Sequence, residues 1–305
     1  MYIEKITFKN VKGIRVQTQM FDAVFLPENG GKIVSLKERE TKYELLAQDK
    51  NEIYLPQSEE SIYVNNEVSG ADDLFPTIDP CRTGFANNEE YPCHGEVLRY
   101  PHDYSFDNNV LKMEFKSSKF GYDFAKEVSE GDKGELCISY SIKNTSEEDF
   151  PCIFGLHCML KAVENGKILL FEKNESAIIM FDELNEYGKR MEVTKLTEQM
   201  LISKKYSENA NTYKIYATER KKTGKCGYYN PEINKNIILS YDAEKIPYLG
   251  IWMNNGRFKG MYSATLEPCT MPYDSVERAN EEGYNFIIKS KCTYCADITF
   301  TVERN

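Results

Sequence analysis

The chain has 305 residues, of which 41% are hydrophobic and 28% are charged, and this composition excludes a disordered or fibrous protein. Its formal net charge is -10. Because nucleic acids and anionic membranes are bound through positively charged surfaces, both are poor partners for this chain, and a highly phosphorylated ligand is disfavoured. A neutral small molecule fits the charge better.

The N-terminal residues 1–8 carry charges where a signal peptide would need its apolar region, and no apolar run is long enough to span a membrane. We therefore expect a cytoplasmic protein. The nine cysteines are an odd number scattered through a large chain, which does not look like a secreted disulfide framework. We expect them to be reduced thiols.

Alternation of apolar and polar residues recurs along the whole chain and predicts half-buried antiparallel strands. The first clear pair is residues 23–26 and 33–36, and the Gly-rich turn sequence at 27–31 separates them as a hairpin requires. Further alternating segments lie at residues 112–116, 136–143 and 297–303, and further turn sequences at residues 107–109, 130–134 and 254–256. The pattern therefore predicts mainly β-hairpins, and it contains no repeated strand-helix-strand units.

Helical signals are few and short. The strongest is the capping-box spacing from Asp274 to Glu277, in which Asp274 would accept a hydrogen bond from the Glu277 amide and Gly283 would end the helix. Residues 183–206 are polar and mixed, which indicates an excursion over the surface. Because no repeat or linker divides the chain, we predict one all-β domain over residues 1–305, a large antiparallel β-sandwich with few short helices.

Only three histidines occur, so few groups can transfer protons near neutral pH. His157 ends an apolar stretch, where an imidazole is either a packed core residue or one that projects into a cleft. His94 precedes Gly95, which permits close backbone approach, and this makes His94 a candidate for ligand contact. His102 follows a proline and is expected to be a surface or packing residue.

Three further side chains are candidates for a ligand site. Glu267 stands at a strand end before Pro268, where desolvation could raise its pKa into the range of a general base. A salt-bridged Glu at the rim is the other interpretation. Trp252, the only tryptophan, either stacks on a sugar ring or packs in the core. Arg82 follows a loop that mixes acidic, aromatic and proline residues.

Metal and cofactor motifs are weak in this sequence. Cys292 and Cys295 have a two-residue spacing, but no second pair exists and alternation would place them on opposite faces of a strand. No Gly-rich phosphate loop precedes a helix. We therefore expect neither a metal nor a cofactor.

Several fragments, taken in chain order, resemble the aldose 1-epimerase (galactose mutarotase-like) family over nearly the whole chain. They are the turn at 27–31 with Glu44-Leu45-Leu46, Phe75-Pro76 before Arg82, His94-Gly95, the strand that ends at His157, and Leu266-Glu267. The family's catalytic His is followed by Pro-Tyr-Phe, whereas Cys158-Met159-Leu160 follow here, so the sequence is similar to a divergent branch rather than to the galactose enzymes.

The resemblance implies that Glu267 takes the proton from the anomeric O1 of a free aldose while His157 donates a proton to the ring oxygen. It also implies that Arg82 and His94 hold ring hydroxyls. The predicted protein is thus a cofactor-free isomerase whose partner is a small-molecule sugar, as a monomer or a homodimer.

Three alternatives stay open. The same sandwich could bind a sugar without turnover. A sugar-phosphate mutarotase would need further basic residues, for which Arg99 and Arg257 are the candidates. Glycoside hydrolysis would require two opposed carboxylates, with Asp72, Asp73 and Asp242 as candidates.

Overall fold

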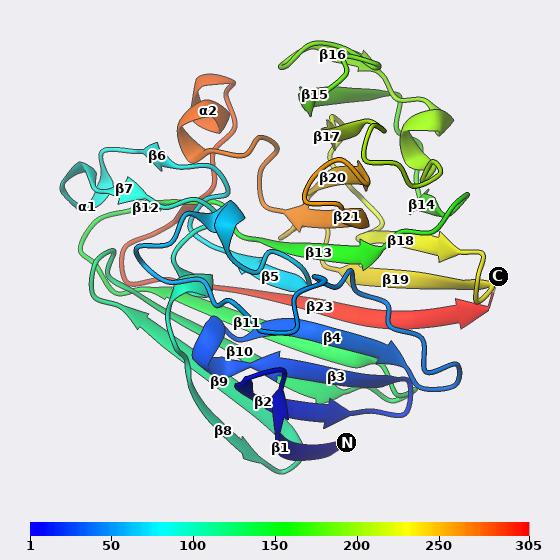
Figure 1. Cartoon of the computed structure of the whole chain (residues 1–305). Coiled ribbons are helices and arrows are strands. Elements are labelled where there is room, and N and C mark those ends of the chain that lie inside the picture. Colours follow the sequence, from blue (N-terminus) through cyan, green and yellow to red (C-terminus); the bar gives the residue numbers. More distant parts are fainter. Residues whose placement is uncertain (305) are drawn as a thin grey trace.

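The computed structural model describes residues 1–304 and shows two large antiparallel sheets that pack on a common core (Figure 1). The eleven-stranded sheet has the order β1-β2-β3-β4-β5-β13-β21-β20-β17-β15-β16. Its strands are β1 (Tyr2–Phe8), β2 (Val11–Gln17), β3 (Phe21–Leu26), β4 (Lys32–Glu38), β5 (Ala71–Leu74), β13 (Gly155–Lys161), β15 (Ser176–Asp182), β16 (Val193–Lys195), β17 (Thr212–Ala217), β20 (Tyr248–Asn255) and β21 (Tyr262–Cys269).

The second sheet has eight strands in the order β14-β18-β19-β23-β11-β10-β9-β8. Its strands are β8 (Asp103–Asp107), β9 (Val110–Ser117), β10 (Tyr122–Glu130), β11 (Leu136–Asn144), β14 (Lys167–Leu170), β18 (Lys225–Asn230), β19 (Lys235–Tyr241) and β23 (Thr293–Arg304). Two short ribbons join β6 (Cys81–Arg82) to β7 (Glu90–Tyr91) and β12 (Phe150–Pro151) to β22 (Ile287–Ile288). The prediction of an all-β antiparallel sandwich is thus confirmed.

The alternation of apolar and polar residues explains which side chains of a strand face the core. In β11, Leu136, Ile138, Tyr140 and Ile142 are buried, and the residues between them are more exposed. Residues 27–31 join β3 to β4 as a hairpin, as their turn sequence predicts. The nine cysteines are all free.

Helices are few, as predicted: α1 (Phe85–Asn88), α2 (Val276–Glu281) and the 3-10 turns η1 (Pro27–Asn29), η2 (Tyr63–Asn65), η3 (Val97–Arg99) and η4 (Glu198–Leu201). The predicted cap of α2 is wrong by one residue. The side chain of Ser275, not Asp274, accepts the hydrogen bond from the backbone N–H of Arg278, at 3.1 Å. Gly283 follows the helix with a left-handed φ of 84°, as a terminating glycine should.

Residues 183–206 are mostly exposed, as predicted, although the short edge strand β16 lies within them. None of the helices within residues 1–304 has the length and apolar character that crossing a membrane requires.

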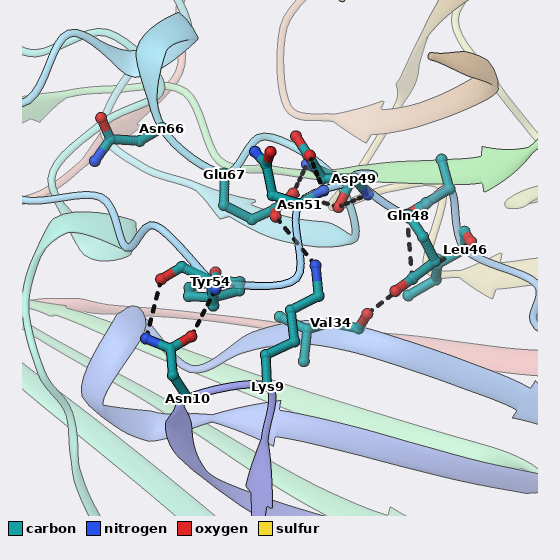
Figure 2. Close-up of polar contacts among 12 residues, drawn as sticks. Lys9, Asn10, Val34, Leu46, Gln48, Asp49, Asn51, Tyr54, Asn66 and Glu67 are labelled. Atoms are coloured by element: carbon teal, nitrogen blue, oxygen red, sulfur yellow. Dashed lines mark hydrogen bonds and ion pairs between the residues drawn. The ribbon is translucent and has the colours of Figure 1, made fainter. Parts of the chain in front are cut away.

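The long connection between β4 and β5 runs over the surface and carries Tyr63. Figure 2 shows how it is fastened to the sheet: Asn10 exchanges two hydrogen bonds with the backbone of Tyr54, at 2.6 and 3.4 Å. The amide of Gln48 donates to the carbonyl of Val34 at 2.9 Å. These contacts hold in place a segment that has little regular structure of its own.

Candidate functional site

Neighbouring strands of the eleven-stranded sheet place polar side chains on the face opposite to the main core. In β13, Leu156 and Cys158 belong to that core, so His157 between them must point to the other side. In β21, Leu266 belongs to the core and Glu267 points away from it. Because β13 and β21 are paired, the imidazole and the carboxylate lie on one face.

The next strands along the sheet extend the same face. Lys214 of β17 lies opposite Trp252 of β20, and Gly250 of β20 lies opposite Glu267. A Cβ atom at Gly250 would lie 2.9 Å from the ring of Tyr216 and 3.2 Å from the Cβ of Glu267. The absence of a side chain at this position therefore gives the Glu267 carboxylate its room.

A cavity of about 610 Å³ opens on this face. Among its lining residues are His94, His157, Lys214, Trp252 and Glu267. The volume falls within the range of about 300–1,000 Å³ that is typical of small-molecule sites. Four strands and one loop, far apart in the chain, thus supply a single concave site.

His157 and Glu267 face each other inside the cavity. The Nε2 atom of His157 lies 3.9 Å from Oε1 of Glu267, and their side chains are 3% and 0% exposed. Burial lowers the pKa of His157 to about 3, so the imidazole of the free protein is neutral at pH 7. Burial also raises the pKa of the Glu267 carboxyl above its ordinary value, although the Lys214 ammonium opposes that shift.

Lys214 lies between two carboxylates. Its Nζ atom is 2.7 Å from Oε2 of Glu267 and 2.7 Å from Oδ1 of Asp274, and the same Asp274 oxygen accepts a hydrogen bond from the hydroxyl of Tyr216 at 2.8 Å. Burial alone would lower the pKa of Lys214, but Asp274 and Glu267 raise it above its ordinary value. Lys214 is therefore a fixed cation that holds one oxygen of Glu267.

Asp72 and Tyr63 lie next to the two imidazoles. Asp72 is the register partner of His157 across β5 and β13. Its carboxylate lies 3.0 Å from Nζ of Lys32 and accepts a hydrogen bond from the hydroxyl of Tyr63 at 3.1 Å. The ring of Tyr63 stacks on His94, with centroids 3.7 Å apart.

The structure brings together four of the five predicted site residues. His94 lies beside His157 with ring centroids 5.1 Å apart, and Trp252 lies 5.8 Å from His157 in a stacked arrangement. Gly95 is the close backbone approach that the sequence indicated, because a Cβ there would meet the carbonyl of Phe75 at 2.0 Å. The roles of these residues remain predictions.

Arg82 does not line the cavity, so its predicted contact with the ligand is wrong for this structure. Its exposed guanidinium lies 3.4 Å from Glu90 and donates to the carbonyl of Asn88 at 2.5 Å. The reason is the short β6–β7 ribbon, which pairs Arg82 directly with Glu90. An exposed guanidinium that does line the cavity is that of Arg190, from the segment after β15.

Of the residues named for a sugar-phosphate mutarotase and for glycoside hydrolysis, some lie at the cavity and others do not. Arg257 lines the cavity, whereas the guanidinium of Arg99 is buried and donates to backbone carbonyls of two loop segments, residues 58–61 and 93–95. Asp73 points into the core, where it pairs with Lys126, and Asp242 is not among the residues that line the cavity. Of the three aspartates, only Asp72 lies at the site, beside His157, so Asp72, Asp73 and Asp242 do not form the opposed pair of carboxylates that hydrolysis would need.

Lys214 and Asp274 are two members of the site that the sequence analysis missed. Lys214 is a lone charge in the apolar run 212–217, which is a signal that a strand presents one polar side chain to a site. The sequence around Asp274 predicts a helix cap rather than a site residue, because its spacing to Glu277 is that of a capping box. Its carboxylate is instead drawn to Lys214 and Tyr216.

The arrangement of these groups suits acid–base chemistry on a small polar ligand. A carboxylate held by a cation can accept a proton, an adjacent imidazole can exchange one, and Trp252 offers an aromatic face to a sugar ring. The imidazoles of His94 and His157 together with the carboxylate of Asp72 are also a set of possible metal ligands.

No family model matches this chain, and no curated protein matches its sequence. Solved structures do match its fold. A galactose mutarotase-like protein from Clostridium acetobutylicum is 17% identical, with a TM-score of 0.67, over 100% of this chain and 99% of that one. A galactose mutarotase-like protein from Lactobacillus casei is 16% identical, with a TM-score of 0.67, over 95% of this chain and 100% of that one.

A galactose mutarotase related enzyme from Lactobacillus acidophilus is 14% identical, with a TM-score of 0.64, over 95% of this chain and 97% of that one. Each of these likenesses extends over nearly the full length of both proteins, and the sheets described above account for it. This chain has the fold of the galactose mutarotase-like proteins.

Proposed function

We propose that this protein is an aldose 1-epimerase-like isomerase that interconverts the α and β anomers of a free aldose. The observation that carries the proposal is the pair of His157 and Glu267, 3.9 Å apart in a cavity of sugar size. The anomeric O1 and the ring O5 are bonded to the same carbon, so an acid and a base that act on them must be close neighbours. The fold neighbours described as mutarotase-like support the same assignment.

The proposed reaction needs one base and one acid. The Glu267 carboxylate removes the proton from O1 while protonated His157 gives its proton to O5, which opens the ring. Rotation about the bond between C1 and C2 exposes the other face of the aldehyde, and the reverse proton transfers close the ring. Lys214 holds Oε2 of Glu267, so that Oε1 is the oxygen left to act on the sugar.

Anomer exchange of a panel of free aldoses, followed by NMR, tests the proposal. At least one sugar is expected to exchange faster with wild-type protein than in buffer, and His157→Asn is expected to reduce that gain by about 10²–10⁴-fold because the acid is lost. A protein that binds a sugar but leaves its exchange at the buffer rate would instead be a carbohydrate-binding protein. Equal rates for wild type and variant would remove the catalytic assignment.

The pH dependence of this exchange follows from the low pKa of His157. With a pKa of about 3, only about one molecule in 10⁴ carries the imidazolium at pH 7, and that fraction falls about tenfold with each further pH unit. The protein-catalysed rate, after subtraction of the buffer rate, is therefore expected to fall about tenfold per pH unit from about pH 7 to about pH 9. A flat profile over this range would contradict His157 as the acid.

A further inference from the structure

Three side chains from separate parts of the chain meet at the inner end of the site. Asp72 lies on β5, His157 on β13 and His94 in the loop after β7. One ligand atom from each, a carboxylate oxygen and two imidazole nitrogens, lies within 4.8 Å of the other two. Two imidazoles and one carboxylate are a donor set that divalent transition metals take in proteins, with further coordination positions left open.

Both imidazoles have a ring nitrogen that no protein group within residues 1–304 contacts by a hydrogen bond. The Nδ1 atoms of His94 and His157 are buried and have no hydrogen-bond partner. An unpartnered buried nitrogen is costly unless something occupies its lone pair or takes its proton.

The ligand atoms are also held in place by other groups. Tyr63 stacks on the His94 ring, and its hydroxyl donates to Asp72 at 3.1 Å. The backbone N–H of His94 donates to the carbonyl of Ile78 at 2.5 Å. Lys32 lies 3.0 Å from Oδ1 of Asp72. Such outer contacts orient metal ligands in proteins.

Several carboxylates gather near the cluster. The carboxylates of Asp72, Asp79, Glu267 and Asp274 lie in this part of the protein. The cations there are Lys32 and Lys214, together with Arg190, Arg257 and Lys259 of the cavity lining. Burial together with repulsion from Asp274 raises the pKa of Asp79, which shows that the carboxylates crowd one another. A bound divalent cation would relieve this repulsion.

We propose that Asp72, His94 and His157 bind one divalent transition-metal ion, with Co²⁺ and Zn²⁺ as the probes, and that its open positions face the cavity. Binding itself does not depend on the proposed isomerase activity. One consequence does rest on that activity. A metal on His157 occupies the lone pair that must take up a proton to form the imidazolium, the acid of the proposed reaction, so the metal is expected to inhibit anomer exchange reversibly.

The test is a titration of metal-stripped, full-length protein with Co²⁺, whose visible absorption reports its ligands. We expect one equivalent to bind with a spectrum that lacks thiolate charge-transfer bands, and His94→Gln to weaken binding by at least about 100-fold. His102→Gln is the matched control, because His102 is buried elsewhere, against Phe115, and should leave binding unchanged. Cys93→Ser, beside the cluster, should also leave it unchanged.

Two results would overturn the site: no saturable Co²⁺ or Zn²⁺ binding to the wild-type protein, or binding of equal strength in His94→Gln. Thermal unfolding of each variant shows whether it is folded, and the wild-type titration decides the matter if the variant is not. Metal binding, together with no anomer exchange by the metal-free protein, would support the site and refute the isomerase. Anomer exchange by the metal-free protein, together with no metal binding, would support the isomerase and refute the site.

Discussion

Glu267→Gln is expected to lower the protein-catalysed rate of anomer exchange by about 10²–10⁴-fold, the effect of removing a general base. The amide has the size of the carboxylate and can still accept a hydrogen bond from Lys214, which lies 2.7 Å from Oε2. It cannot, however, take the proton from O1. The substitution should therefore slow the chemical step and have little effect on the affinity for the sugar, so kcat should fall far more than KM changes.

NMR exchange at saturating and limiting sugar concentrations measures both quantities. Asp242→Asn is the matched control, since this carboxylate is outside the cavity and its nearest cation is Lys245 at 3.9 Å. The control should retain the wild-type rate. A Glu267→Gln protein that retains most of its activity would show that Glu267 is not the base.

Lys214→Met is expected to lower the free energy of unfolding by about 3–5 kcal/mol near pH 8, the cost of breaking a buried charge pair. Met keeps much of the length of the side chain but removes the charge, and so leaves the carboxylates of Glu267 and Asp274 buried without their common cation. The Lys214 side chain is 7% exposed and that of Glu267 is 0% exposed, so solvent screens the remaining negative charges only weakly.

The sign of the pH dependence gives a second measure of the same effect. Without Lys214 the pKa of Glu267, already raised by burial, should rise further above its value in the unfolded chain. The folded variant then binds more protons than the unfolded chain between those two pKa values, so its stability should recover as the pH falls toward about 5. Chemical denaturation at several pH values measures this recovery.

Lys214→Arg is the control, because it keeps the positive charge and should lose much less stability. A Lys214→Met protein as stable as wild type at pH 8, or one whose deficit does not change with pH, would show that the three groups do not act as a buried ionic cluster.

Local patterns in the sequence account for the strands and for the side to which each residue points. The alternation at residues 136–143 predicts which side chains of β11 are buried, and the turn at residues 27–31 predicts the hairpin of β3 and β4. Alternation also requires Asp72 and Asp73 to face opposite sides of β5. The prediction that His157 and Glu267 belong together came from resemblance, because they are far apart in the chain.

Local sequence misassigned two residues whose partners are distant. Arg82 follows the right kind of loop, but pairing with Glu90 in the β6–β7 ribbon turns it away from the cavity. Asp274 has the spacing of a helix cap, yet the buried ammonium of Lys214, from β17, is a stronger partner for its carboxylate than a backbone amide. Neighbouring residues in the sequence do not show that Arg82 pairs with Glu90 or that Asp274 pairs with Lys214.

The sequence by itself thus determined the class of fold, the antiparallel strands and the two faces of each strand, because a strand's alternation depends only on the residues within it. The tertiary structure decided which face is the cavity, since that depends on the strand order β5-β13-β21-β20-β17. Only this order brings Asp72, His157, Glu267 and Lys214 to one place, and long-range packing, rather than local preference, sets it.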